Sequence, residues 1–93
     1  MKTNRVVWPV PVREKLLSFH GRHFTPEETL DFIVQLIIEI EELLLNPVLT
    51  KTYTEEFGEY EGVSRVVVHG FRAYYEQMEN DIVVLAVKFP GEI

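Results

Sequence analysis

Cysteine is absent from the 93 residues of this chain. Without cysteine the chain can form no disulfide bond, no thiolate zinc site and no cysteine nucleophile. Glycine and proline number only five each, too few for a low-complexity segment. The absence of cysteine suits a protein of a reducing compartment, and we expect it in the cytoplasm.

The chain also lacks a long apolar run and an excess of basic charge. The most apolar stretch, 30–45, is interrupted by one glutamine and three glutamates, whereas a membrane span needs about 20 mostly apolar residues. We therefore expect no membrane segment, and the polar start at 1–5 predicts no signal peptide. Fifteen acidic residues against nine basic ones give a net charge of −6, which argues against a general nucleic-acid coat protein. A small local basic patch stays compatible with this charge.

Apolar residues make up 46% of the chain and aromatic residues 12%, which is enough for one efficient core. Domains contain from about 50 to 250 residues. We therefore expect a single domain that spans 1–93.

The first half of the chain predicts one short strand and two helices. Residues 5–8 favour a strand, which Pro9 ends, and Pro11 suits the first turn of a helix. A second helix begins at Thr25-Pro26-Glu27-Glu28, which is a capping box with proline at the first helical position. Because 30–45 is apolar on most sides, we expect this helix to be mostly buried, with a narrow polar stripe.

The last third predicts a β-meander. Two strands, 63–68 and 71–77, flank the two-residue turn His69-Gly70. The continuous apolar run 82–87 predicts a strand that is buried on both faces. The connector 48–62 is compatible with a short edge strand. The order β-α-α-β-β-β predicts an α+β fold, with two helices packed on one face of a small, mainly antiparallel sheet.

The turn His69-Gly70 also predicts which side chains share a face. It sets Arg65 opposite Tyr74, and Arg72 falls on the same face, away from the helices. Arginine presents a rigid fork of donors that suits phosphate, so this cluster is a candidate phosphate-binding patch. Lys88 joins it only if the turn after residue 77 has the right length, which the pattern leaves open.

A plainer interpretation of the same residues stays open. Exposed strand faces often carry arginine, tyrosine and glutamate as cross-strand partners, and Arg72 and Glu76 could simply find nearby opposite charges. The three histidines lie in loops and turns without the spacing of metal ligands, and we expect no metal or cofactor. Four acidic residues of the connector favour a solvated loop over a catalytic carboxylate pair: Glu55, Glu56, Glu59 and Glu61.

Several segments carry a resemblance to a known family. Residues 40–47 read IEELLLNP, and residues 70–76 read GFRAYYE, followed by an acidic turn and the run 82–87. Together with the strand 6–8 that leads into a leucine-rich helix, these segments resemble the RelE/ParE superfamily of bacterial type II toxin–antitoxin toxins. The resemblance covers nearly the whole chain.

The resemblance implies a toxin that is bound by a cognate antitoxin protein. RelE-like members are ribosome-dependent nucleases that cut mRNA with basic residues on the sheet face, and ParE-like members inhibit DNA gyrase without that catalytic set. The resemblance places Arg72 on the family's arginine and Arg65 near a basic position one strand earlier. Lys88 or Tyr74 would then be the candidates for proton transfer.

The chain departs from the nuclease pattern at its C-terminal segment. After residue 87 it reads KFPGEI, where the family usually carries a histidine or arginine run and nucleases often a later tyrosine. Together with the acidic charge, this departure leaves three activities open: an mRNA endonuclease, a gyrase inhibitor and a toxin-like interaction domain without toxicity. The oligomeric state is open as well, with a homodimer among the options.

Overall fold

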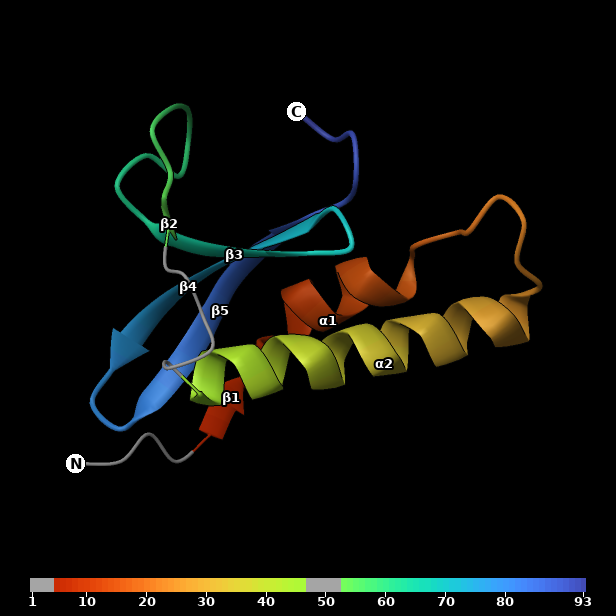
Figure 1. The fold of residues 1–93 in the computed structure, drawn as a ribbon, viewed down its shortest axis with the longest axis horizontal. Helices are drawn as coiled ribbons and strands as arrows, with labels where there is room; N and C mark the ends of the chain where they lie inside the picture. Colours follow the sequence, from red (N-terminus) through yellow and green to blue (C-terminus); the bar gives the residue numbers. More distant parts are fainter. Residues whose placement is uncertain (1–4, 47–52) are drawn as a thin grey trace.

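The computed structural model describes residues 5–46 and 53–93, and Figure 1 shows the arrangement of their helices and strands. The elements are β1 (Arg5–Val7), α1 (Val10–Leu17), α2 (Pro26–Leu45), β2 (Tyr53–Thr54), β3 (Ser64–Val68), β4 (Phe71–Met78) and β5 (Asp81–Lys88). This is the predicted order, with the short strand β2 added from the connector.

The five strands form one mixed sheet in the order β1-β5-β4-β3-β2. β1 runs parallel to β5, and the other neighbouring strands are antiparallel. Both helices pack on one face of this sheet (Figure 1), which confirms the predicted α+β fold. We call the opposite face the outer face. The core between the helices and the sheet contains Val12, Leu16, Ile33, Leu36, Ile40, Leu44, Val66, Val68, Phe71, Ala73, Ile82, Val84 and Val87.

The start of α2 follows the predicted capping box. The hydroxyl of Thr25 accepts a hydrogen bond from the Glu28 N–H at 3.1 Å, and the Glu28 carboxylate accepts one from the Thr25 N–H at 2.8 Å. Because Pro26 has no N–H, this helix start leaves three N–H groups unpaired, and two of them are satisfied in this way. The N-terminus of α2 is therefore fixed by purely local chemistry.

The rest of α2 is less buried than predicted. Ile33, Leu36 and Ile40 face the sheet and are at most 1% exposed, whereas Leu30 and Val34 are 50% and 45% exposed. The prediction of a mostly buried helix is wrong because a two-layer domain covers only one side of each helix. Neither helix of the described residues is long and apolar enough to cross a membrane.

A β-bulge sets the register between the last two strands. Tyr75 pairs with Val84 and Tyr74 pairs with Ala86, so Leu85 is an extra residue in β5. Leu85 is 37% exposed, so the prediction that this strand is buried on both faces is wrong. Because a shift by one residue moves a side chain to the other face, the bulge places Lys88 on the outer face.

Candidate functional site

The four predicted site residues lie together on the outer face, on three adjacent strands. Arg65 of β3 pairs with Tyr74 of β4, as the His69-Gly70 turn predicted. Arg72 of β4 pairs with Lys88 of β5. The register therefore gives two side-by-side pairs and fixes the position of Lys88, which the sequence had left open.

The turn between β3 and β4 carries this register. His69 and Gly70 have positive φ angles of 51° and 83°, the conformation that a tight two-residue hairpin turn requires at both positions. Glycine adopts such an angle without steric cost, whereas a histidine seldom does. The His69 ring lies 2.8 Å from the Glu39 carboxylate of α2, which ties the turn to the helix layer and away from the outer face.

The loop 55–62 packs on the outer face over Tyr74. Hydrogen bonds from the Glu55 N–H to the Val63 carbonyl and from the Gly62 N–H to the Glu55 carbonyl, 3.0 and 2.8 Å long, close this loop. The Tyr60 ring stacks on the Tyr74 ring with centroids 4.6 Å apart. Tyr74 is therefore fully buried at 0% exposure, and the expectation of an open face is wrong at this position.

The carboxylate of Glu55 connects two of the predicted site residues. It accepts a hydrogen bond from Arg65 Nη1 at 2.9 Å through Oε1 and one from the Tyr74 hydroxyl at 2.5 Å through Oε2. The bond from Tyr74, with help from the Arg65 charge, lowers the pKa of Glu55. Burial and the bond to Glu55 raise the pKa of Tyr74. The tyrosine hydroxyl is thus neutral and occupied, which does not suit a proton-transfer group.

Both an aromatic ring and a carboxylate contact the Arg65 guanidinium. Its guanidinium lies 5.9 Å from the centroid of the Tyr53 ring, a cation–π contact, in addition to the ion pair with Glu55. Its Nε atom is buried and donates a hydrogen bond to no other described residue. The side chain therefore keeps one unused donor inside the site.

Arg72 is fastened by the segment that follows β5. Its Nη2 donates to the main-chain carbonyl of Glu92. The Glu92 carboxylate itself accepts hydrogen bonds from Lys15 Nζ and from the Phe89 N–H, and these bonds lower its pKa. Within 5–46 and 53–93, Arg72 forms no ion pair with a carboxylate, so its positive charge is not neutralised by contact.

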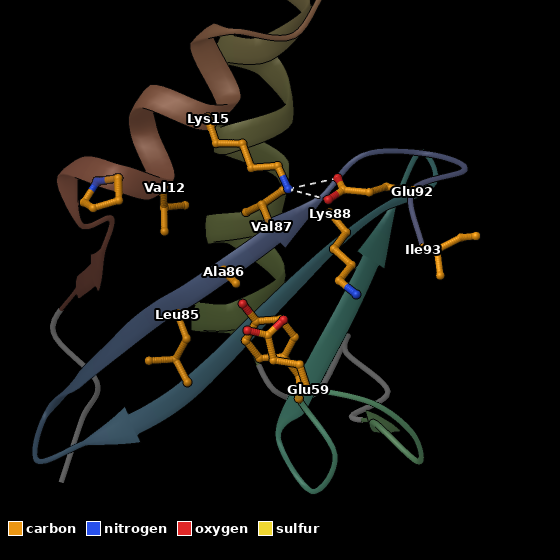
Figure 2. Close-up of a pocket in the computed structure, with 11 residues that line it drawn as sticks. Val12, Lys15, Glu59, Leu85, Ala86, Val87, Lys88, Glu92 and Ile93 are labelled. Atoms are coloured by element: carbon orange, nitrogen blue, oxygen red, sulfur yellow. Dashed lines mark hydrogen bonds and ion pairs between the residues drawn. The ribbon is translucent and has the colours of Figure 1, made fainter.

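Lys88 is a second cation on the outer face. Like Arg72, it forms no ion pair with a carboxylate in the part of the chain that the structure describes. Its ammonium lies 5.7 Å from the centroid of the Tyr60 ring. Figure 2 shows the side chain extending away from the Lys15–Glu92 ion pair, into an open pocket of about 350 Å³. The pocket is lined by Pro11, Val12, Lys15, Glu59, Tyr60, Leu85, Ala86, Val87, Lys88, Glu92 and Ile93.

The sequence did not predict the role of Glu55. The acidic stretch was interpreted as a solvated loop, because a run of glutamates is usually exposed. No local signal marks it, because the contact depends on the pairing of Tyr53 with Arg65. Glu55 lies two residues beyond Tyr53, so the alternation of an extended strand brings its carboxylate to the face of Arg65.

No group of three or more histidine, aspartate or glutamate side chains within 5–46 and 53–93 is arranged to hold a metal ion. Comparisons with family profiles, with curated proteins and with solved structures find no significant match to this chain. The candidate function is therefore argued from the geometry of the outer face and from the sequence motifs.

Proposed function

We propose that this protein is the toxin of a bacterial type II toxin–antitoxin system of the RelE/ParE kind, acting in the cytoplasm and bound by a cognate antitoxin. The observation that carries the proposal is the register that sets Arg72 beside Lys88 and Arg65 beside Tyr74 on one face. These are the residues that the resemblance singles out.

In this proposal Arg72 and Lys88 bind a phosphate group of mRNA on the ribosome. The guanidinium of Arg72 offers several donors in a fixed fork, and the ammonium of Lys88 adds a mobile charge. Positioned cations of this kind stabilise the negative charge that develops when a phosphodiester bond is cut. Lys88 is also the better candidate for proton transfer, because Glu55 occupies the hydroxyl of Tyr74.

One observation favours a second candidate function, without catalysis. Glu55 neutralises Arg65 and occupies Tyr74, so two of the four candidate catalytic groups are engaged within the chain. A ParE-like inhibitor of DNA gyrase, or an interaction domain without toxicity, needs no free catalytic set. Such a protein would use the same face for binding only, and it would still be bound by an antitoxin.

The test is induced expression in a bacterial host, with growth, mRNA integrity and chromosomal DNA integrity followed in one culture. The wild type is compared with Arg72→Ala and with Arg13→Ala, which removes the same charge from the exposed side of α1. We expect growth arrest for the wild type and for Arg13→Ala. We expect Arg72→Ala to lose the growth arrest, because the loss of one transition-state donor lowers the rate of the chemical step by about a hundredfold or more.

Each outcome assigns or removes a function. mRNA cut within coding regions supports the nuclease, and DNA breaks with intact mRNA support the gyrase inhibitor. No arrest from a folded wild-type protein contradicts both toxin activities. A folded Arg72→Ala variant that still arrests growth removes Arg72 from the site.

A further inference from the structure

Arg65 and Tyr74 converge on a single carboxylate. The distances are 2.9 Å from Arg65 Nη1 to Glu55 Oε1 and 2.5 Å from the Tyr74 hydroxyl to Oε2. The Glu55 side chain is only 14% exposed and that of Arg65 is 29% exposed. Two donors that meet two oxygens of one partly buried anion form the geometry of an oxyanion receptor.

The receptor has one donor that its present occupant does not reach. Arg65 Nε is buried and has no hydrogen-bond partner among the described residues, and a buried donor without a partner is costly. The oxygens of Glu55 bond Arg65 Nη1 and the Tyr74 hydroxyl, and in this position neither forms a hydrogen bond with Nε. A phosphate group presents three strong acceptor oxygens, so a third oxygen could meet Nε while two others meet the first two donors.

The surrounding charges also favour an anion with more charge than one carboxylate. The positive charge of Arg72 acts on the Glu55 carboxylate in addition to that of Arg65. Lys88 lies on the same face, opposite Arg72, and its charge acts on Glu92. Two guanidinium charges therefore act on the single negative charge of Glu55.

We propose that Arg65 and Tyr74 form a phosphate-binding site that Glu55 of the same chain fills in the free protein. Its ligand class rests on the proposed function, which brings RNA phosphates to this face. Glu55 then acts as a built-in competitor, and phosphate binds only when the carboxylate withdraws. Because the competitor belongs to the same chain, its effective concentration is in the millimolar range or above, so the wild-type protein binds free phosphate weakly.

The stacked pair Tyr60–Tyr74 makes the loop 55–62 part of this competition. Tyr60 lies between the Tyr74 ring and the Lys88 ammonium, so withdrawal of Glu55 with its loop would uncover Tyr74 and release Lys88 together. The four site residues would then face one open surface. The contact of Glu55 with Arg65 and Tyr74 thus inhibits phosphate binding until a more highly charged ligand displaces the carboxylate.

The experiment is a titration of purified protein with inorganic phosphate at constant ionic strength, followed by the NMR resonance of the Arg65 Nε–H group. Glu55→Gln keeps the shape of the side chain and removes its charge. Glu56→Gln, an exposed neighbour in the same loop, makes the same charge change outside the site. We expect Glu55→Gln to bind phosphate at least about tenfold more tightly than both the wild type and Glu56→Gln.

Two further variants keep the result interpretable. Glu55→Asp retains the charge but withdraws it by one methylene, and an intermediate affinity is expected even if Glu55→Gln folds poorly. Adding Arg65→Ala to Glu55→Gln should abolish the gain.

Equal phosphate affinity of Glu55→Gln and Glu56→Gln would overturn the site, as would a gain that survives the loss of Arg65. The measurement uses no ribosome or host cell. Phosphate binding by a protein that proves non-toxic would therefore overturn the proposed function and support the site.

Discussion

Tyr74 is a fully buried residue on the sheet face that points away from the core. Its burial follows from the Tyr60 ring above it and from the Glu55 carboxylate at its hydroxyl. The bond from this hydroxyl is the main cause of the lowered pKa of Glu55. The pKa of the Glu55 carboxylate therefore depends mainly on the phenol group of Tyr74.

Replacing Tyr74 with phenylalanine removes that group and keeps the ring. We expect the pKa of Glu55 to rise toward its ordinary value, because the largest cause that lowers it is lost. The pKa can be measured from the pH dependence of the Glu55 side-chain carbonyl resonance. Tyr75→Phe is the matched control, because Tyr75 lies on the helix face. An unchanged Glu55 pKa in Tyr74→Phe would contradict the contact.

At the scale of single residues, the sequence predicted which residues are neighbours on the sheet, but it did not predict the loop that packs over Tyr74. The opposition of Arg65 and Tyr74 follows from a two-residue turn and the alternation of a strand, which are both local. The contact between Glu55 and Tyr74 depends on where a loop packs after the sheet has formed. No local pattern encodes that position, so the face was expected to be open.

Among the elements, β5 shows how one residue decides the composition of the site. The bulge at Leu85 turns Lys88 to the outer face and Val87 to the core, where Val87 is 2% exposed. If the same sequence formed a regular ladder in which Leu85 paired with Tyr74, Arg72 would face Val87, and Lys88 would point toward the helices. The bulge therefore serves the core and the candidate site together.

Deleting Leu85 should consequently remove the bulge and keep the pairs on both sides of it, with Arg72 still opposite Lys88. We expect a loss of only about 1 kcal/mol in the free energy of unfolding, since Leu85 is partly exposed. Inserting an alanine after Ala86 should cost about 3–5 kcal/mol, because it turns Lys88 toward the helices and buries an unpaired ammonium. Urea denaturation of both variants measures the difference. Equal losses would show that the register after the bulge does not fix the faces of Val87 and Lys88.

The second helix also has one feature that local sequence predicts and one that depends on packing. The capping box at Thr25 was predicted because its donors and acceptors lie within four residues. The exposure of Leu30 and Val34 was not, because an apolar helix does not reveal how many layers will cover it. The bulge escaped prediction for a similar reason: it exists only as a relation between two strands.

At the scale of the whole molecule, the net charge of −6 conceals a local arrangement. Three cations gather on one face, and acidic side chains from a loop and from the C-terminal segment hold two basic groups: Glu55 binds Arg65, and Glu92 binds Lys15. The overall charge therefore argues only against broad nucleic-acid binding, and a single phosphate site on this face stays compatible with it.

The same two carboxylates make a prediction about the stability of the whole fold. The contacts of Glu55 with Tyr74 and Arg65, and of Glu92 with Lys15, lower the pKa values of these carboxyl groups in the folded state. A glutamate of the unfolded chain titrates near pH 4.3. The unfolded state then binds more protons between the two values, so the stabilisation is fully present above about pH 5 and is lost as the pH falls through the unfolded and then the folded pKa values.

Thermal unfolding from about pH 7 to pH 3 measures this dependence. We expect the free energy of unfolding to fall below about pH 5 in the wild type, with a shallower fall in Glu55→Gln and in Glu92→Gln. Glu56→Gln should retain the wild-type slope, since the described residues give its side chain no ion pair. If Glu55→Gln shows the full wild-type slope, Glu55 does not couple the acidic loop to the stability of the sheet. The inhibitory contact would then lack the strength to exclude phosphate.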